Sequence, residues 1–505
     1  MKGEKSLKRI LVVCLCVHAV CLRASSVPET WLGASDAEAY DNFGYSVAAD
    51  GALTVIGATG DDDMGSAAGA AYVFERSGDV WTQTAKLTAA DGTNSDYFGR
   101  SVAISGGRIV VGADSDDDAG SNSGSAYVFE EVEGVWTQTV KLAASDGAAG
   151  DYFGCCVAVE SNRIVVGAYC DDDRGSSSGA AYVFERVDGV WTQTVKLTAA
   201  DGSSFDYFGR AVAMSDGRIV VAAERAAGAS ATDAGGVYVF GESGGVWTQV
   251  AKLAASDGAN YDYFGCTVSI SGNRIVVGAY RDDDAGTDSG SAYVFECAAG
   301  VWQQAAKLAA GDGAAFDGFG RSVAISGTNV LAGAYQDNDS GSVSGSAYVF
   351  RKTVSGWMQA GKLRASDGAT GDRLGWSASL AGHDALCGAY YATRDGLTAC
   401  GAAYVFDTGK MTNTVPVVRD QTISLVAEGE CYIDLDFSDP DGQAMTFRIV
   451  LSPTNGALES YEDRHGTTAY RGRYYYSWDG VSKPDTFTWE VTDGQGTSAV
   501  ATVTI

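Results

Sequence analysis

The hydrophobic and polar positions of this chain repeat with a long period. Each unit starts at a Phe-Gly pair and continues with a short alternating apolar run, a denser run such as RIVVGA, an AYVF run and a VWTQTVKL run. β-Branched and aromatic residues dominate these runs, and Gly, Asp, Asn and Ser separate them, which is typical of short antiparallel strands. The unit therefore predicts four β-strands and an all-β fold.

Seven such units follow one another at a spacing of 55 or 56 residues. A fixed period of this length is typical of solenoids and propellers. Four antiparallel strands per unit predict a seven-bladed β-propeller, with a stacked solenoid as the alternative. The units start at the following pairs: Phe43-Gly44, Phe98-Gly99, Phe153-Gly154, Phe208-Gly209, Phe264-Gly265, Phe319-Gly320 and Leu374-Gly375.

The two ends of the repeat region favour the closed propeller. The last unit finishes at its third strand, Ala403–Phe406, and an additional segment, Val27–Leu32, precedes the first Phe-Gly pair in the position of a fourth strand. We therefore expect the N-terminal strand to complete the last blade and close the ring. The propeller is assigned to residues 25–406.

A second domain follows the repeats. Residues 407–416 form a polar linker, and residues 417–505 contain strand runs separated by turn sequences such as Asp439-Pro-Asp-Gly442. About 90 residues with this pattern predict an immunoglobulin-like or cadherin-like β-sandwich.

The first 24 residues predict a secretory signal peptide. Four basic residues precede an apolar run, Ile10–Leu22, which is too short for a comfortable transmembrane helix. A buried N-terminal strand is the alternative. We expect the mature chain to be secreted or displayed at the cell surface, without direct insertion into the membrane.

An extracellular location bears on two modifications. Disulfides form in that compartment, and Cys387 with Cys400 is the best candidate pair because both residues are placed on neighbouring strands of one repeat. Asn338, in Asn338-Asp-Ser340, matches the acceptor pattern for N-glycosylation.

The charge excludes several classes of partner. Asp and Glu total 64 against 35 Lys and Arg, which gives a net charge of −29. Such a chain repels nucleic acid and anionic membrane surfaces, so an extracellular protein or carbohydrate is the expected partner of a monomeric propeller. Only His383 and His465 follow residue 24, too few and too isolated for a His-based hydrolase or a zinc site.

An acidic triplet lies between the second and third strands of five units. Alternate side chains of an extended segment share a face, so the first and third Asp could provide oxygen ligands to Ca²⁺. A solvated turn, in which Asp caps backbone N–H groups, is the alternative. The candidate ligands, including two from the second domain, are Asp61, Asp63, Asp116, Asp118, Asp171, Asp173, Asp282, Asp284, Asp337, Asp339, Asp439 and Asp441.

A second acidic set recurs in the connection from each fourth strand to the next first strand. In an up-and-down blade this connection emerges on the same face as the acidic triplet, together with tyrosines that flank both loops. These tyrosines are either recognition residues or side chains packed at strand ends. The candidate ligand-facing residues are Asp96, Asp151, Asp206, Asp262, Tyr169, Tyr280 and Tyr335.

The order Phe-Gly, VVGA and AYVF resembles the FG-GAP repeat of the integrin α-subunit head, from Ser25 to Phe406. The resemblance implies an extracellular ligand-binding propeller. Integrin repeats carry a DxDxDG calcium loop between the first two strands, whereas this chain has a bare turn such as Ser105-Gly-Gly-Arg108, so that site is not implied. The DPDG at Asp439–Gly442 and the terminal Thr486–Ile505 resemble cadherin-like modules.

These observations favour an adhesion or ligand-binding protein that uses an acidic loop face ordered by Ca²⁺, and not an enzyme. A propeller glycoside hydrolase with paired Asp is one alternative. The Asp residues repeat with the period, however, and a catalytic pair would usually break the symmetry. A purely structural matrix or cell-wall protein is the other alternative.

Overall fold

A computed structural model describes residues 27–227, 232–411, 417–418, 420–422, 430–435, 437–438, 445–460, 473–478, 485–492 and 499–505. The predicted signal peptide, residues 412–416 of the predicted linker, and the candidate ligands Asp439 and Asp441 lie outside these residues.

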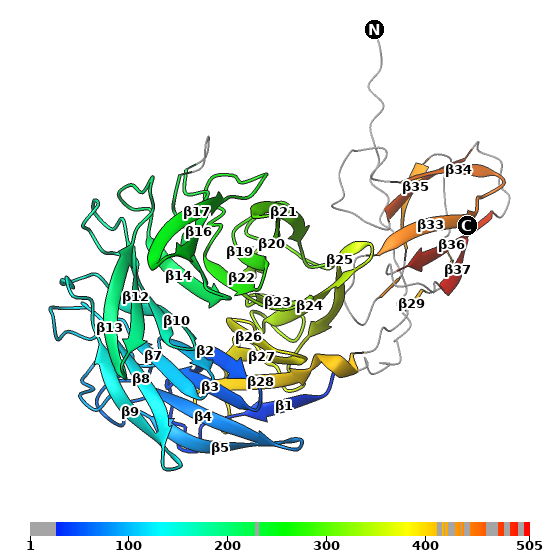
Figure 1. Ribbon diagram of the computed structural model, residues 1–505. Helices are drawn as coiled ribbons and strands as arrows, with labels where there is room; N and C mark the ends of the chain where they lie inside the picture. Colours follow the sequence, from blue (N-terminus) through cyan, green and yellow to red (C-terminus); the bar gives the residue numbers. More distant parts are fainter. Residues whose placement is uncertain are drawn as a thin grey trace, which may run out of the picture.

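The repeats form seven four-stranded antiparallel sheets, as predicted (Figure 1). We name the strands of each blade A to D in the order of the repeat. Blades 1 to 3 contain β2 (Phe43–Asp50), β3 (Leu53–Ala58), β4 (Ala70–Ser77) and β5 (Val80–Leu87); β6 (Ser101–Ser105), β7 (Arg108–Ala113), β8 (Ser125–Val132) and β9 (Val135–Leu142); β10 (Phe153–Glu160), β11 (Arg163–Ala168), β12 (Ala180–Val187) and β13 (Val190–Leu197).

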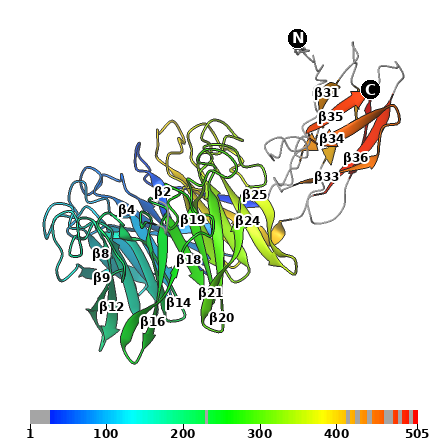
Figure 2. The ribbon, with the colours of Figure 1, turned by 90° about the horizontal axis from the view of Figure 1, so that it is seen from above.

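The remaining blades follow the same plan, and their sheets lie side by side with the first three (Figure 2). Blades 4 to 7 contain β14 (Phe208–Ser215), β15 (Arg218–Ala223), β16 (Gly236–Ser243) and β17 (Val246–Leu253); β18 (Thr267–Ser271), β19 (Arg274–Ala279), β20 (Ser291–Ala298) and β21 (Val301–Leu308); β22 (Phe319–Ser326), β23 (Asn329–Ala334), β24 (Ser346–Thr353) and β25 (Gly356–Leu363); β26 (Ser377–Ala381), β27 (Asp384–Ala389), β28 (Ala402–Asp407) and β1 (Glu29–Leu32).

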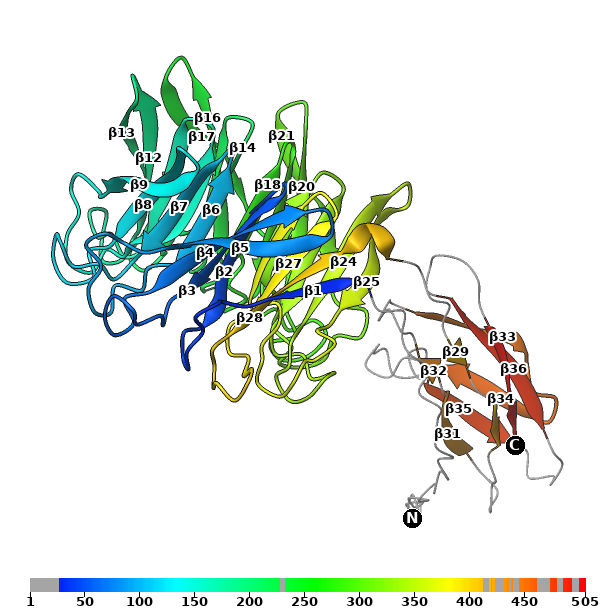
Figure 3. The same cartoon turned by 90° about the horizontal axis from the view of Figure 1, so that it is seen from below.

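The N-terminal strand completes blade 7, as predicted. β1 lies beside β28 (Figure 3) and pairs with it in the antiparallel direction. In this register Trp31 is opposite Tyr404. Blade 7 also contacts blade 1, because the Ser377 hydroxyl donates a hydrogen bond to the Gly44 carbonyl at 2.8 Å. Since the last repeat contacts the first, the repeats form a ring and not an open solenoid.

The core lies between blades. Phe98 packs edge-on against Tyr127 and Phe129, with ring centroids 5.4 and 5.9 Å away. The same buried cluster includes Val55 and Val73 of the preceding blade. Each repeat therefore buries its apolar face against its neighbour, which a single repeat cannot do alone.

Two glycines per repeat allow this close packing. Gly99, of a Phe-Gly pair, has a φ of +90°, and an added Cβ would lie 2.4 Å from the Ala70 carbonyl oxygen. Gly112, in the RIVVGA run, faces the Gly154 carbonyl oxygen of the next blade, 2.0 Å from an added Cβ. At both positions an added Cβ would overlap a backbone oxygen of the adjacent blade, which explains why the pattern places glycine there, except for Ala222 in blade 4.

Beyond the propeller lie a short 3-10 helix, η1 (Thr408–Lys410), and the predicted sandwich domain. Its two main sheets have the orders β30-β37-β36-β33 and β31-β35-β34, and they share a core around Trp489, Tyr476 and Val503. Its strands are β29 (Val417–Val418), β30 (Gln421–Thr422), β31 (Glu430–Asp434), β32 (Phe437–Ser438), β33 (Thr446–Leu451), β34 (Gly456–Ser460), β35 (Arg473–Trp478), β36 (Thr486–Thr492) and β37 (Ala499–Thr504).

The predicted disulfide between Cys387 and Cys400 is not formed, and both thiols are free and buried. Cys387 lies opposite Tyr404 in the β27–β28 register. Cys400 lies before β28, in the B–C connection, four residues away from Tyr404; four residues span roughly 13 Å in an extended chain. A disulfide needs Cα atoms within about 7 Å, so the strand register forbids this bond.

The glycine contact can be tested with two Gly→Ala variants. Gly99 and Gly106 both have positive φ, but only Gly99 faces backbone, whereas an added Cβ at Gly106 meets nothing within 4 Å. We expect Gly106→Ala to cost about 1 kcal/mol from backbone strain alone, and Gly99→Ala to cost on the order of 3 kcal/mol or more. Thermal unfolding of both variants measures the difference, and equal costs would contradict the packing argument.

Candidate functional site

The B–C and D–A connections lie together at one end of the propeller, which we call the loop face; in blade 2 they are residues 88–100 and 114–124. Backbone hydrogen bonds join the two kinds of connection, such as Ser95 N to Ser66 O at 2.8 Å and Phe98 N to Ala68 O at 2.9 Å. The prediction that both acidic sets share one face is therefore confirmed. The A–B connections are short turns at the other end, as expected.

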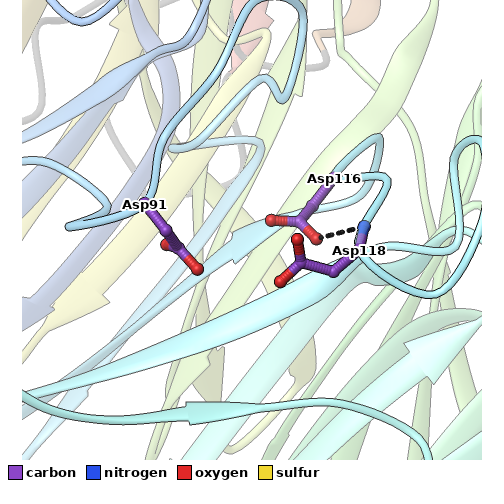
Figure 4. Close-up of side chains that lie close together, drawn as sticks. All are labelled: Asp91, Asp116 and Asp118. Carbon is purple, nitrogen blue, oxygen red and sulfur yellow. Dashed lines mark hydrogen bonds between the residues drawn. The ribbon is translucent and has the colours of Figure 1, made fainter.

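A lysine side chain lies among the acidic residues of blade 2. Lys141, from strand D, places its Nζ 2.8 Å from Asp91, 2.9 Å from Asp116 and 2.5 Å from Asp118. Asp116 is buried, and the Tyr127 hydroxyl donates to its Oδ2 at 2.8 Å. Figure 4 shows Asp91 reaching in from the D–A connection toward Asp116 and Asp118 of the B–C loop. We call this arrangement the lysine clasp.

The lysine clasp recurs in four other blades with the same donors and acceptors. Each contains a strand D lysine, two Asp residues of the triplet, one Asp of the D–A connection and a strand C tyrosine. The members are Lys86, Asp36, Asp61, Asp63 and Tyr72; Lys196, Asp146, Asp171, Asp173 and Tyr182; Lys307, Asp257, Asp282, Asp284 and Tyr293; Lys362, Asp312, Asp337, Asp339 and Tyr348.

Blade 4 lacks the acidic triplet, and its lysine clasp is reduced. Ala226 is in the position of the buried Asp, so Lys252 pairs only with Asp201, at 2.7 Å. The buried Tyr238 hydroxyl, whose equivalents donate to that Asp, has no hydrogen-bond partner among the described residues. Replacement of the buried Asp by Ala226 thus leaves the Tyr238 hydroxyl without the acceptor that its equivalents have.

Blade 7 replaces the lysine with an arginine from another element. Its strand D is β1, in which Trp31 occupies the lysine position opposite Tyr404. Arg394, from the B–C loop, instead lies 3.1 Å from Asp367 and 3.0 Å from Asp372, and it donates to the Tyr404 hydroxyl. A side-chain cation is therefore kept at this place even where strand D cannot supply it.

The charges of the lysine clasp stabilise one another. Burial alone would lower the pKa of Lys362, but the negative charges of Asp312 and Asp337 outweigh it and raise this pKa. Burial would likewise raise the pKa of Asp337, but Lys362 lowers it below its usual value. Both groups remain charged at neutral pH.

The carboxylates of the lysine clasp are also the residues that could hold a metal ion. The carboxylate oxygens of Asp91, Asp116 and Asp118 lie within 4.8 Å of one another, close enough to hold an ion, and so do those of the equivalent group in blade 5. The ammonium of Lys141, however, contacts all three carboxylates. A divalent ion fits these carboxylates only if the lysine leaves.

The four candidate ligand-facing Asp residues are buried in the D–A turns. Asp96, for example, is 2 % exposed, and its Oδ2 accepts a hydrogen bond from the Thr93 backbone N–H at 2.6 Å. They close their turns and are not displayed on the surface. The equivalent bonds, from the residue three positions earlier, are accepted by Asp151, Asp206 and Asp262.

The three candidate tyrosines are half-buried and pack near the centre of the ring. Tyr169 stacks on Tyr152 with ring centroids 5.4 Å apart, and Tyr335 meets Trp376 edge-on at 5.4 Å. Tyr280 stacks on Tyr263 at 6.1 Å. This geometry matches the alternative of packing at strand ends. Asn338 lies in an exposed stretch of its loop, and its glycosylation stays a prediction.

The sequence reasoning missed four exposed aromatic residues of the loop face. Each lies three residues before the Phe of the Phe-Gly pair and immediately before the buried Asp of the D–A turn. Each has a φ between 68° and 73°. Bulky residues rarely adopt this left-handed conformation, and repeats 3 and 7 place glycine there. The residues are Tyr40, Phe205, Tyr261 and Phe316, whose exposed fractions are 61, 56, 52 and 56 %.

Comparison with known families identifies both domains. The FG-GAP repeat model matches seven segments, and the bacterial Ig domain model matches residues 413–505. The repeat matches cover residues 29–74, 81–129, 136–184, 191–240, 247–295, 302–350 and 357–406.

Other comparisons add little. No curated protein matches the chain. A chain in the solved structure titled "Crystal Structure of Mitotic Checkpoint Complex" is similar at 11% identity and a TM-score of 0.48, over 78% of this chain and 99% of that one. A likeness of this size carries no argument about function.

The lysine clasp can be tested with matched Lys→Met variants. Lys362 and Asp337 are almost fully buried, so Lys362→Met leaves clustered carboxylates without their cation, at an expected cost of about 3–5 kcal/mol. Lys252→Met removes one exposed pair and should cost less than about 1 kcal/mol. Thermal unfolding distinguishes the two. Similar losses in both variants would show that the clasp does not stabilise the blade.

The buried Asp residues of the D–A turns predict a pH dependence. Burial raises the pKa of Asp41 and of Asp317 to about 6, so the folded protein binds more protons than the unfolded chain between about pH 4 and pH 6. Their contribution to stability therefore increases as the pH falls from 7 to about 4.

We expect the variant Asp41→Asn/Asp317→Asn to flatten this dependence of the melting temperature, because the amide keeps a hydrogen-bond acceptor and removes the charge. The exposed pair Asp117→Asn/Asp172→Asn is the control. An unchanged slope between pH 7 and pH 5 would contradict the assignment of these two carboxyl groups.

Proposed function

Because the chain belongs to the FG-GAP repeat family, we propose that it is an extracellular protein, secreted or displayed at the cell surface, which binds a protein or carbohydrate ligand through the loop face. The bacterial Ig domain would serve as a spacer. Both families are generally non-enzymatic, which supports binding over catalysis. Within the described residues, no helix has the length and apolarity needed to cross a membrane.

The observation that carries this proposal is the set of strained, exposed aromatic residues. A non-glycine residue at a left-handed φ costs about 1–2 kcal/mol, and such strain is typical of ligand-contacting positions. Aromatic side chains also dominate the centres of binding interfaces. Phe205, Tyr261 and Phe316 come from three consecutive D–A connections, so they provide a run of contacts and not an isolated one.

Exposed carboxylates complete the loop face. The third Asp of each triplet is bound to the lysine on one side and is open to solvent on the other; the Asp118 side chain, for example, is 68% exposed. A carboxylate accepts hydrogen bonds from sugar hydroxyls and from basic side chains. Aromatic rings beside acceptors favour a ligand that offers apolar faces and donors.

Calcium and the lysine ammonium would compete for the same carboxylates of the lysine clasp. We propose that the ammonium of the lysine clasp orders the acidic loops under ordinary conditions, because it already contacts the carboxylates that calcium would use. A calcium ion would need to displace it.

The ligand-binding proposal is tested on glycan and protein arrays with the full chain. We expect the triple variant Phe205→Ala/Tyr261→Ala/Phe316→Ala to lose at least tenfold in affinity for any ligand that the wild-type protein retains. The matched control is Val135→Ala/Val190→Ala/Val246→Ala, which removes equally exposed apolar side chains from the C–D hairpins at the other end. Failure to retain any ligand, or equal losses in both variants, would contradict the proposal.

The competition is tested by thermal unfolding with calcium. The variant Lys141→Met/Lys307→Met leaves two groups of three carboxylates without their ammonium. We expect 1 mM Ca²⁺ to raise its melting temperature by several degrees more than that of the wild type. Lys252→Met, in the blade without a triplet, is the control. An equal rise in the wild type would show that lysine does not hold the place of the ion.

A further inference from the structure

We propose that the centre of the ring is a binding pocket for a small carboxylate ligand. This proposal goes beyond the loop-face proposal and uses none of its residues. The A strands of all seven blades surround a cavity of about 200 Å³. Three arginines, Arg100, Arg210 and Arg321, line it, although the chain as a whole carries a net charge of −29.

The lining comes from two or three consecutive positions of every repeat, directly after the Phe-Gly pair. The second of these positions always holds a small side chain, which is Ser in four of the seven repeats. The first position does not repeat with the period: from the first repeat to the seventh it reads Tyr, Arg, Cys, Arg, Cys, Arg and Trp. Large and charged side chains that differ from blade to blade at a position facing one cavity point to a site that recognises something without sevenfold symmetry.

The charges at this pocket do not balance. Arg100 pairs with Asp114 at 2.9 Å, and Arg210 pairs with Glu224 at 3.2 Å. Arg321 has no ion pair with any described residue, and its guanidinium lies over the Trp376 ring at 4.1 Å. Three guanidinium groups therefore face two carboxylates, and one positive charge is left over.

The surroundings of Arg321 make an anion favourable. Burial and the positive charge of Arg210 both lower the pKa of Arg321. The carboxylate of Glu224, which pairs with Arg210, acts in the opposite direction but does not outweigh them. An anion at the pocket would offset both effects. The side chains of Arg100 and Arg210 are 25 and 23% exposed and both line the pocket, so a ligand can reach them.

The chemistry favours a carboxylate. A guanidinium presents parallel N–H groups whose spacing matches the two oxygens of a carboxylate. Trp376 and Tyr45 supply apolar walls on one side of the cavity. A cavity of this size holds a short organic acid and excludes a polymer, so the ligand is a small molecule and not a chain segment.

The test uses the full chain and sodium succinate as the probe, with titration followed by calorimetry and by tryptophan fluorescence against sodium chloride of equal ionic strength. We expect succinate to bind the wild type and to bind Arg321→Met at least tenfold more weakly. Arg321→Lys keeps the charge without the planar donor group and should be intermediate. It also serves as the test if the Met variant fails to fold.

Arg364→Met is the matched control, because it removes an arginine that pairs with Asp339 on the loop face outside the pocket. It should bind succinate as the wild type does. The proposal is overturned if the wild type does not bind succinate at millimolar concentration, if Arg321→Met binds it equally well, or if inorganic phosphate binds and succinate does not. Array binding by the loop face should persist in Arg321→Met, which separates failure of this proposal from failure of the loop-face proposal.

Discussion

The close backbone contact between consecutive blades is the constraint on which the rest of this structure depends. Gly57 of blade 1 lies so near the Gly99 carbonyl oxygen of blade 2 that an added Cβ would be 2.1 Å away, and the Ser46 hydroxyl bonds the same oxygen at 2.8 Å. Blade 4 lacks both of the residues that make this contact. There Ala222 replaces the glycine and Ala211 replaces the serine, so this joint has no hydroxyl bond to the next blade and Gly265 faces a methyl group instead.

The lysine clasp holds together the connections of the loop face, as the glycine contacts hold together the blades of the core. Lys141 joins strand D, the B–C loop and the D–A connection of one blade through a single ammonium. Three carboxylates around one ammonium still leave a net negative charge, so the loop face remains acidic. Much of the acidity is nevertheless structural. The shape of the loops is thus set by internal ion pairs, and in blade 7 Arg394 performs the same task from a different element.

The sequence predicted the blades, the ring closure and the sandwich well, because each depends on a residue class repeated at a fixed spacing. It predicted the lysine clasp poorly. Lys141 belongs to the recurring VWTQTVKL run, but its three Asp partners are 23, 25 and 50 residues away in the sequence. Only the strand register brings them together. The failure of Cys387 and Cys400 to pair has the same origin, since neighbouring strands do not imply neighbouring residues. The strain at Phe205 depends on φ, which a residue pattern does not specify.

Repetition and departure from repetition therefore mean different things in this chain. Residues that recur in every repeat, such as the glycine of the Phe-Gly pair, are explained by packing between blades, and selection for a stable ring suffices to keep them. Residues that change at an equivalent position cannot be required by the ring, because the other blades fold without them. The positions after the Phe-Gly pair and before the buried Asp of the D–A turn both vary in this way. Arg321 lies at the first and Phe316 at the second, so the two functional proposals rest on the places where the fold leaves the residue free to differ.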